Sequence, residues 1–213
     1  MPITPHDVQS LFEQAGAFLS GHFLLTSGLH SPNYLQCALV LMDPARAERL
    51  GQALAQSLEE TAKTRPDLVI SPALGGVVIG HEVARALGVP FLFTERDANR
   101  VMTLRRGFML QPGQKVYVVE DVITTGGSTR EVVEVVEAAG AVALAAGSIV
   151  DRSAGKADVG APRVALWQLS VESFPPEFCP LCDKSIPVVK PGSRLAPSLD
   201  PGASGSRLPA SRG

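Results

Sequence analysis

Two adjacent acids stand between a buried strand and a loop of small polar residues. The run from Val116 to Val119 is apolar, Glu120 and Asp121 follow it directly, and residues 124–128 read TTGGS before an amphipathic helical pattern that extends to Ala139. The backbone N–H groups and hydroxyls of such a loop can bind a phosphate at a helix N-terminus, and carboxylates beside it can bind a ribose diol or Mg²⁺. The pattern therefore predicts a site for a phosphorylated sugar with a metal ion.

The spacing of this segment distinguishes it from other phosphate-binding motifs. The chain contains no GxxxxGK[ST] string, and the loop does not read GxGxxG, so neither a Walker A loop nor a dinucleotide-binding turn is predicted here. A plainer interpretation is an ordinary strand–loop–helix in which a serine or threonine caps the helix. An acidic pair directly before TTGGST is much rarer than a glycine-rich turn, and it favours a binding site.

The order of two acids, a hydrophobic pair and a TTGGST loop resembles the phosphoribosyl-diphosphate (PRPP) signature of type I phosphoribosyltransferases. The resemblance implies that the acids hold the ribose hydroxyls and that the loop holds the 5′-phosphate. A second strand–turn–helix, residues 71–85, matches the loop that contacts pyrophosphate in that family, although helix–sheet packing is the alternative role of its glycines. The PRPP-binding set implied in this way is Glu120, Asp121, Val122, Ile123, Thr124, Thr125, Gly126, Gly127, Ser128, Leu74, Gly75 and Gly76.

The segment FLLTSGLHSPNY, residues 23–34, is similar to the hairpin that lies over the pyrimidine in orotate phosphoribosyltransferases. This narrower resemblance covers about residues 12–152. An arginine suits the planar carboxylate of orotate because its guanidinium group donates two parallel hydrogen bonds, and a surface salt bridge is the alternative role for Arg152. The orotate-binding set implied by the resemblance is Ser27, Gly28, Tyr34, Thr124 and Arg152.

Three departures separate the chain from many orotate phosphoribosyltransferases. Thr26 stands where they carry a lysine, the pyrophosphate loop lacks a lysine, and the mobile loop (residues 95–107) has arginines but neither lysine nor histidine. Arginine can hold pyrophosphate but cannot donate a proton near neutral pH. We therefore expect Arg96 and Arg100 to stabilise the departing pyrophosphate. Together with the strings TLRRGF and CPLC, the departures indicate a divergent bacterial branch, or a copy that has lost activity.

The resemblance implies a reaction, a cofactor and an assembly. The reaction transfers the phosphoribosyl group of PRPP to orotate and gives orotidine 5′-phosphate and pyrophosphate, a step of UMP biosynthesis. Mg²⁺ is expected to be bound mainly through PRPP, with no direct protein ligand, and the mobile loop is expected to close over the neighbouring site of a homodimer. A purine phosphoribosyltransferase and a non-catalytic PRPP-sensing regulator are the alternatives; the hairpin argues against the first, and the lack of a basic DNA-binding domain against the second.

Composition places the chain among globular cytoplasmic proteins. Of 213 residues 45% are hydrophobic and the net charge is −2 without a basic block, so no nucleic-acid partner is predicted. The apolar runs are too short to span a membrane, and the amphipathic N-terminus carries acids, unlike a signal peptide. Three cysteines are too few for a disulfide framework, which favours a reducing compartment.

Cys179 and Cys182 form a lone CxxC pair. A structural zinc ion needs about four ligands and one CxxC supplies two, so we expect a reduced, unliganded pair, with zinc shared across a dimer as the alternative. The histidines His22, His30 and His81 are scattered along the sequence, and we expect each of them to be structural rather than a metal ligand.

The predicted elements alternate between strand and helix. Strands are expected at 67–71, 89–94, 115–120, 141–151 and 164–171, and helices from Thr4 or Asp7 to 17, at 43–64, from the 71–76 turn to about 88, and at 128–139. This alternation predicts an α/β fold with a mostly parallel central sheet and helices on both faces, and the resemblance adds a small N-terminal hood. We expect one domain over residues 1–190, with hood and orotate hairpin at 1–40 and core at 41–190, and a disordered Pro/Gly/Ser-rich tail at 191–213.

Overall fold

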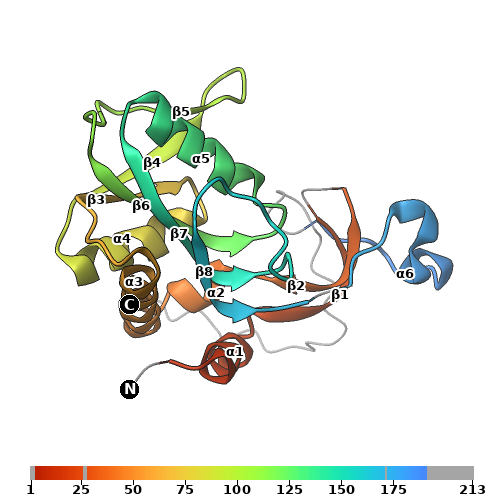
Figure 1. Cartoon of the computed structure of the whole chain (residues 1–213). Coiled ribbons are helices and arrows are strands. Elements are labelled where there is room, and N and C mark those ends of the chain that lie inside the picture. Colours follow the sequence, from red (N-terminus) through yellow and green to blue (C-terminus); the bar gives the residue numbers. More distant parts are fainter. Residues whose placement is uncertain (1–2, 26–27, 171, 191–213) are drawn as a thin grey trace, which may run out of the picture.

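The computed structural model describes residues 3–25, 28–170 and 172–190. Six strands form the central sheet in the order β5-β4-β3-β6-β7-β8, and two form a separate hairpin, β1-β2 (Figure 1). The strands are β1 (Phe18–Leu24), β2 (His30–Leu35), β3 (Leu68–Pro72), β4 (Phe91–Arg96), β5 (Met102–Leu104), β6 (Lys115–Ile123), β7 (Val142–Asp151) and β8 (Arg163–Gln168). The helices are α1 (Pro5–Gln14), α2 (Cys37–Leu41), α3 (Pro44–Ala62), α4 (Gly76–Leu87), α5 (Gly127–Ala138), the 3₁₀ turn η1 (Pro176–Phe178) and α6 (Pro180–Asp183).

The central sheet is parallel except at one edge. β4, β3, β6, β7 and β8 pair in parallel, and β5 pairs antiparallel with β4. From β3 the chain passes outward to β4, whereas from β6 it passes to β7 and β8 on the other side. The order therefore reverses between β3 and β6, which is where open α/β sheets bind their ligands. The predicted mostly parallel sheet is confirmed.

Alternation along the strands builds a core on each face of the sheet. In β6, Tyr117 and Val119 pack with α3 and α4 on one face, whereas Val116 and Val118 pack with α5 on the other. All four side chains are fully buried, which is expected of a central parallel strand covered on both sides. Helices thus cover both faces of the sheet, as predicted (Figure 1).

Local capping chemistry sets the start of α1 and α3. Asp43 accepts hydrogen bonds from the N–H groups of Ala45 and Arg46, and Pro44 occupies the first turn of α3, as the Asp-Pro pair predicts. Thr4 and Asp7 form a reciprocal capping box at α1, so Thr4 is the cap. The predicted end of this helix near residue 17 is wrong because β1 begins at Phe18.

Several element boundaries differ from the predictions. β6 continues through the acidic pair to Ile123, because β7 offers a pairing partner along its whole length, and β8 ends at Gln168. Residues 95–106, predicted to be an irregular mobile loop, include the end of β4 and the short strand β5, which pair as an edge hairpin. The elements α2, η1 and α6 are too short to show a periodic pattern in the sequence, and they were not predicted.

The β1-β2 hairpin is extended by the C-terminal segment of the described chain. Val189 exchanges backbone hydrogen bonds with His22 and Leu24 of β1, and Phe174 does so with His30 of β2. Residues from the early part of the chain and from the last described part therefore meet in one small layer beside the main sheet, with α6 at its outer side (Figure 1). The predicted tail, residues 191–213, lies outside the described residues. No helix among the described residues is long and apolar enough to cross a membrane.

The contact between α3 and α4 yields a stability prediction. An alanine Cβ at Gly51 would lie 2.5 Å from Cβ of Glu82 and 2.8 Å from its backbone carbon, so the helices must separate to accept it. We expect Gly51→Ala to lower the free energy of unfolding by about 1–3 kcal/mol in urea denaturation. Gly127→Ala, whose added methyl meets only Thr125 Oγ1 at 3.7 Å, is the control. Equal urea midpoints for the two variants would contradict this packing.

Candidate active site

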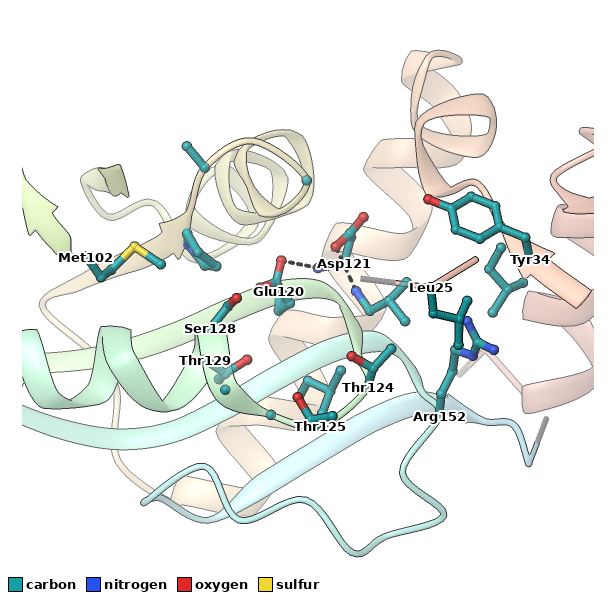
Figure 2. Close-up of a pocket in the computed structure, with 18 of the residues that line it drawn as sticks. Leu25, Tyr34, Met102, Glu120, Asp121, Thr124, Thr125, Ser128, Thr129 and Arg152 are labelled. Carbon is teal, nitrogen blue, oxygen red and sulfur yellow. Dashed lines mark hydrogen bonds between the residues drawn. The ribbon is translucent and has the colours of Figure 1, made fainter. Parts of the chain in front are cut away.

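A cavity of about 490 Å³ opens at the carboxyl ends of β3 and β6, where the strand order reverses. Loops from both strands, the N-terminal end of α5, the hairpin and the end of β7 all contribute to it (Figure 2). The predicted site residues that line it are Tyr34, Gly75, Arg96, Glu120, Asp121, Val122, Ile123, Thr124, Thr125, Gly126, Gly127, Ser128 and Arg152. Residues predicted from five separate segments of the sequence are therefore brought together in one cavity.

The acidic pair forms the middle of the cavity wall. The N–H of Asp121 donates to Glu120 Oε1 at 3.2 Å, and the N–H of Val122 donates to Asp121 Oδ1 at 2.8 Å (Figure 2). Glu120 is 8% exposed, and burial together with the neighbouring charge of Asp121 raises its pKa well above the ordinary value. Burial also raises the pKa of Asp121. Among the described residues, neither carboxylate forms an ion pair with a lysine or arginine.

The glycines of the β3–α4 turn make room for this pair. A Cβ on Gly75 would stand 2.8 Å from both carboxylate oxygens of Asp121, and one on Gly76 would stand 3.2 Å from Glu120 Oε1. The backbone of this turn therefore approaches the acids more closely than any other residue type allows. Gly76 does not line the cavity itself and lies behind Glu120. The predicted contact of this turn with pyrophosphate stays a prediction.

The phosphate-sized loop follows β6 and leads into α5. Residues 124–128 all line the cavity, and α5 begins at Gly127. Ser128 and Thr129 lie at one end of the cavity with Met102 beyond them, and Thr124 lies nearer its centre (Figure 2). Because the N-terminal end of a helix carries partial positive charge, this end of the cavity is suited to an anion.

The opposite end of the cavity holds an arginine and a tyrosine. Arg152 follows β7 directly, and its N–H donates to the carbonyl of Ile123 at 2.8 Å, which fixes it beside the end of β6. Its guanidinium Nη2 donates to Ser31 Oγ of the hairpin at 3.4 Å, and burial lowers its pKa. Burial and the nearby Asp121 raise the pKa of Tyr34, which faces Arg152 and Leu25 across this end (Figure 2).

The two arginines of the predicted mobile loop have different positions. Arg96 lines the cavity and forms an ion pair with Glu131 of α5 at 2.7 Å. Arg100 lies at the tip of the β4-β5 hairpin with a φ of 66° and is exposed outside the cavity lining. An ion pair between Glu95 of β4 and Arg106, just after β5, also joins the two sides of the β4-β5 hairpin at 2.7 Å. The predicted mobile loop is therefore folded and internally paired in this structure.

Some predicted residues lie outside the lining, and others were missed. Gly28, Leu74 and Arg100 do not line the cavity, and Ser27 lies outside the described residues. The lining residues that the sequence interpretation missed are Leu25, Leu35, Gln36, Pro72, Ala73, Met102 and Thr129. Most of these neighbour a predicted residue in sequence. Met102 is the exception, because only the folding of β5 beside β4 brings it to the cavity.

Comparisons with known proteins identify the family to which these features belong. The model of the phosphoribosyl transferase domain matches residues 40–178. The chain is 53% identical to the orotate phosphoribosyltransferase of Desulforamulus reducens over 188 residues, which are 88% of this chain and 96% of that protein. It is also 53% identical to the orotate phosphoribosyltransferase of Pelotomaculum thermopropionicum over 192 residues, covering 90% and 99% of the two chains.

Solved structures show the same architecture. The orotate phosphoribosyltransferase of Aeropyrum pernix superposes with a TM-score of 0.63 at 26% identity, covering 76% of this chain and 93% of that one. The adenine phosphoribosyltransferase of Thermoanaerobacter pseudethanolicus superposes with a TM-score of 0.54 at 21% identity, covering 64% and 88%. The second similarity concerns the fold alone.

The buried Glu120 yields a pH-dependent prediction. Since folding raises its pKa, the stabilising contribution of this group is present below its ordinary pKa of 4.5 and is lost as the pH rises through the higher folded value. Glu120→Gln removes the ionisable group, so we expect the variant to have a higher Tm than wild type at pH 8 and a smaller advantage at pH 5. Each kcal/mol gained in the free energy of unfolding should raise Tm by about 2–4 °C. Thermal melts across pH measure this. The control is Glu137→Gln, an exposed position on α5, and an identical pH profile for both variants would contradict the assignment.

Proposed function

Because the chain belongs to the orotate phosphoribosyltransferase family, we propose that it transfers the phosphoribosyl group of PRPP to orotate and releases orotidine 5′-phosphate and pyrophosphate. The observation that carries the proposal is the order of groups along one cavity. An anion-binding loop lies at one end, the acidic pair in the middle, and Arg152 with Tyr34 at the other end. Purines bring no carboxylate to an arginine, so this order favours orotate over the purine alternative.

Residues 124–128 bind the 5′-phosphate in this proposal. These residues line the cavity at the start of α5, so their N–H groups and hydroxyls are available to the phosphate, and the helix dipole adds to the attraction. A fixed phosphate places the ribose beside Glu120 and Asp121, whose oxygens accept hydrogen bonds from the ribose hydroxyls. The position of the sugar is thus set from two sides before reaction, which reduces the entropic part of the barrier.

The acidic pair is suited to the charge that develops on the sugar and to a cation. Glu120 is buried and Asp121 is partly buried, and neither has an ion-pair partner among the described residues, so their charges are not compensated within the chain. Carboxylate oxygens are the ligand type that Mg²⁺ prefers. Mg²⁺ carried on PRPP, beside Glu120 and Asp121, would neutralise charge on the diphosphate. The carboxylates also stabilise the cation-like ribose while its bond to the diphosphate breaks.

Arg152 and Tyr34 orient orotate in this scheme. The guanidinium group binds the orotate carboxylate, and Tyr34 lies against the ring, so that N1 of the pyrimidine points to the anomeric carbon. N1 loses its proton to solvent and forms the new bond to that carbon as the carbon–oxygen bond to diphosphate breaks, and the electron pair of the broken bond leaves with the diphosphate. Because Arg152 is half-buried, its charge is poorly hydrated and is available to a carboxylate at small desolvation cost.

The β4-β5 hairpin supplies the remaining positive charge. Arg96 reaches the cavity of its own chain, whereas Arg100 is exposed at the hairpin tip outside that cavity. An arginine at this position is placed to serve a neighbouring subunit, and we therefore include a homodimer with shared sites in the proposal. The free cysteines fit the reducing cytoplasm as its location.

The substrate assignment is tested by kinetics with several bases. We expect pyrophosphate release from PRPP with orotate, and none with adenine, guanine or uracil. Arg152→Ala should raise the KM for orotate by about 10- to 100-fold and leave the KM for PRPP nearly unchanged, because only orotate contacts this charge. Arg130→Ala, which removes an exposed arginine of α5, is the charge-matched control. If the KM for orotate and the KM for PRPP rise by the same factor, Arg152 does not bind orotate specifically.

The shared site is tested by mixing two inactive variants. Arg100→Ala removes the positive charge at the tip of the β4-β5 hairpin, and Asp121→Asn removes a carboxylate of the cavity. If each site takes its hairpin from the neighbouring subunit, a hybrid dimer keeps one site that has both groups. Activity should partly recover on mixing, and each variant mixed with itself serves as the control. If a mixture that is shown to exchange subunits stays inactive, the shared-site proposal is wrong. Arg100 and Asp121 would then serve a site within one chain, or Arg100 would have no role in it.

A further inference from the structure

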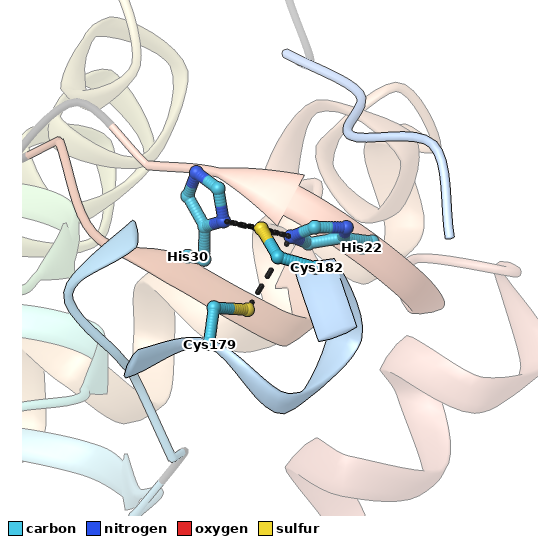
Figure 3. A group of neighbouring side chains, drawn as sticks. All are labelled: His22, His30, Cys179 and Cys182. Atoms are coloured by element: carbon cyan, nitrogen blue, oxygen red, sulfur yellow. Dashed lines mark hydrogen bonds between the residues drawn. The ribbon is translucent and has the colours of Figure 1, made fainter. Parts of the chain in front are cut away.

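Four side chains that can bind a metal converge where the C-terminal segment crosses the β1-β2 hairpin. His22 comes from β1, His30 from β2, and Cys179 and Cys182 from the start and middle of α6 (Figure 3). One ligand atom from each lies within 4.8 Å of all the others. His22, His30 and Cys179 are buried, and Cys182 closes the group from the solvent side. This cluster is distinct from the cavity described above, whose lining contains none of the four residues.

The spacing of the ligand atoms approaches that of a tetrahedral zinc site. With Zn–S near 2.3 Å and Zn–N near 2.0–2.1 Å, neighbouring sulfur and nitrogen ligands stand about 3.6 Å apart, and two nitrogens about 3.3 Å. Here Cys179 Sγ and Cys182 Sγ lie 3.5 and 3.8 Å from His22 Nε2, and Cys182 Sγ lies 3.3 Å from His30 Nδ1. The two nitrogens are 2.8 Å apart, so this pair and the pair formed by Cys182 Sγ and His30 Nδ1 must separate slightly to admit the ion.

A backbone contact already orients the first histidine. Nδ1 of His22 lies 2.7 Å from the carbonyl oxygen of Ile186, and only a protonated Nδ1 can donate to that acceptor. The proton on Nδ1 leaves Nε2 with a free lone pair directed toward the two cysteines and His30. Histidines that bind a metal through one ring nitrogen usually donate a hydrogen bond from the other nitrogen to a carbonyl, a carboxylate or water.

Hydrophobic packing does not account for the position of the C-terminal segment. Within residues 172–190, Cys179 is the one buried side chain, and Phe178 is 75% exposed. Backbone hydrogen bonds to β1 and β2 hold Phe174 and Val189, but the stretch between them, which includes η1 and α6, contributes no other buried residue. A segment of this kind requires another source of stability, such as a metal ion or a disulfide.

We propose that His22, His30, Cys179 and Cys182 bind one Zn²⁺ ion in a closed structural site. Two thiolates and two imidazoles form a ligand set that suits zinc, and four protein ligands leave no position for a substrate. The ion joins α6 to the hairpin that carries Tyr34, and the adjacent Ser31 is a hydrogen-bond partner of Arg152. It therefore stabilises the orotate end of the cavity without taking part in the reaction.

The sequence predicted an unliganded cysteine pair because Cys179 and Cys182 supply only two of the four ligands that a structural zinc ion needs. The missing two come from a hairpin more than a hundred residues earlier in the chain, and His22 and His30 were expected to be only structural. The alternative arrangement is a hydrogen-bonded histidine pair beside two free thiols, in which His30 Nδ1–H donates to His22 Nε2. Metal content distinguishes these two states directly.

The test measures metal in the full-length chain, expressed without a histidine tag and purified under reducing conditions. We expect about one zinc per chain by elemental analysis, consistent with a single four-ligand site. Cys179→Ser, Cys182→Ser, His22→Ala and His30→Ala should each lose most of the bound zinc. Cys37→Ala and His81→Ala, which remove a cysteine and a histidine outside the cluster, should keep it.

Wild-type protein provides a second measurement that does not require the variants to fold. After removal of zinc with a chelator, Tm should fall and should recover on addition of Zn²⁺. Added Co²⁺ should give the visible bands of a tetrahedral ion and a thiolate charge-transfer band. Reduced wild-type protein that neither contains zinc nor binds added Zn²⁺ or Co²⁺, or loss of zinc from the control variants equal to that from the four ligand variants, would overturn the proposal. Because no readout depends on turnover, the result is independent of the proposed function.

Discussion

The placement of two adjacent carboxylates in the cavity wall at the end of β6, one buried and one partly buried, is the constraint on which the rest of the site depends. Glu120 and Asp121 lie at the point where the sheet order reverses, and loss of hydration raises the pKa of both. Such a pair is costly to keep in a fold unless a ligand or cation compensates it. The close turn at Gly75 and Gly76 leaves room for the acids where any side chain would collide with them. Stability is thus reduced at the position where substrate binding can restore it.

In the proposed function the two ends of the cavity have different tasks, and they are built from different parts of the chain. The end assigned to phosphate comes from β6 and α5, which belong to the central sheet and the helices packed on it. The base end comes from the hairpin and the residue after β7, so it can vary without disturbing the phosphate end. Arg152 joins the two parts, because its backbone is bonded to Ile123 of β6 and its side chain reaches Ser31 of β2.

The hairpin layer has little apolar contact of its own on its outer side. The C-terminal segment adds backbone pairing at Phe174 and Val189, and the cluster of two histidines and two cysteines lies between these two points. A metal ion there would make the hairpin and α6 one unit. The precision of the base end would then depend on a site that never touches the substrate, in the way that supporting residues fix a binding constellation.

Local chemistry let the sequence alone determine much of the molecule. The apolar run and acids of β6, the Asp43-Pro44 cap and the alternation of strands with helices each follow from a few neighbouring residues, and they predicted the parallel sheet and most of the cavity lining. The tertiary structure decided what depends on distant partners. β6 extends past its acids because β7 pairs with it, and Met102 reaches the cavity because β5 folds beside β4. Gly76 lies behind Glu120, outside the cavity lining. The convergence of His22 with Cys179 and Cys182 is the clearest case, since side chains so far apart in the sequence have no common local pattern, and only folding brings their atoms within 4.8 Å of one another.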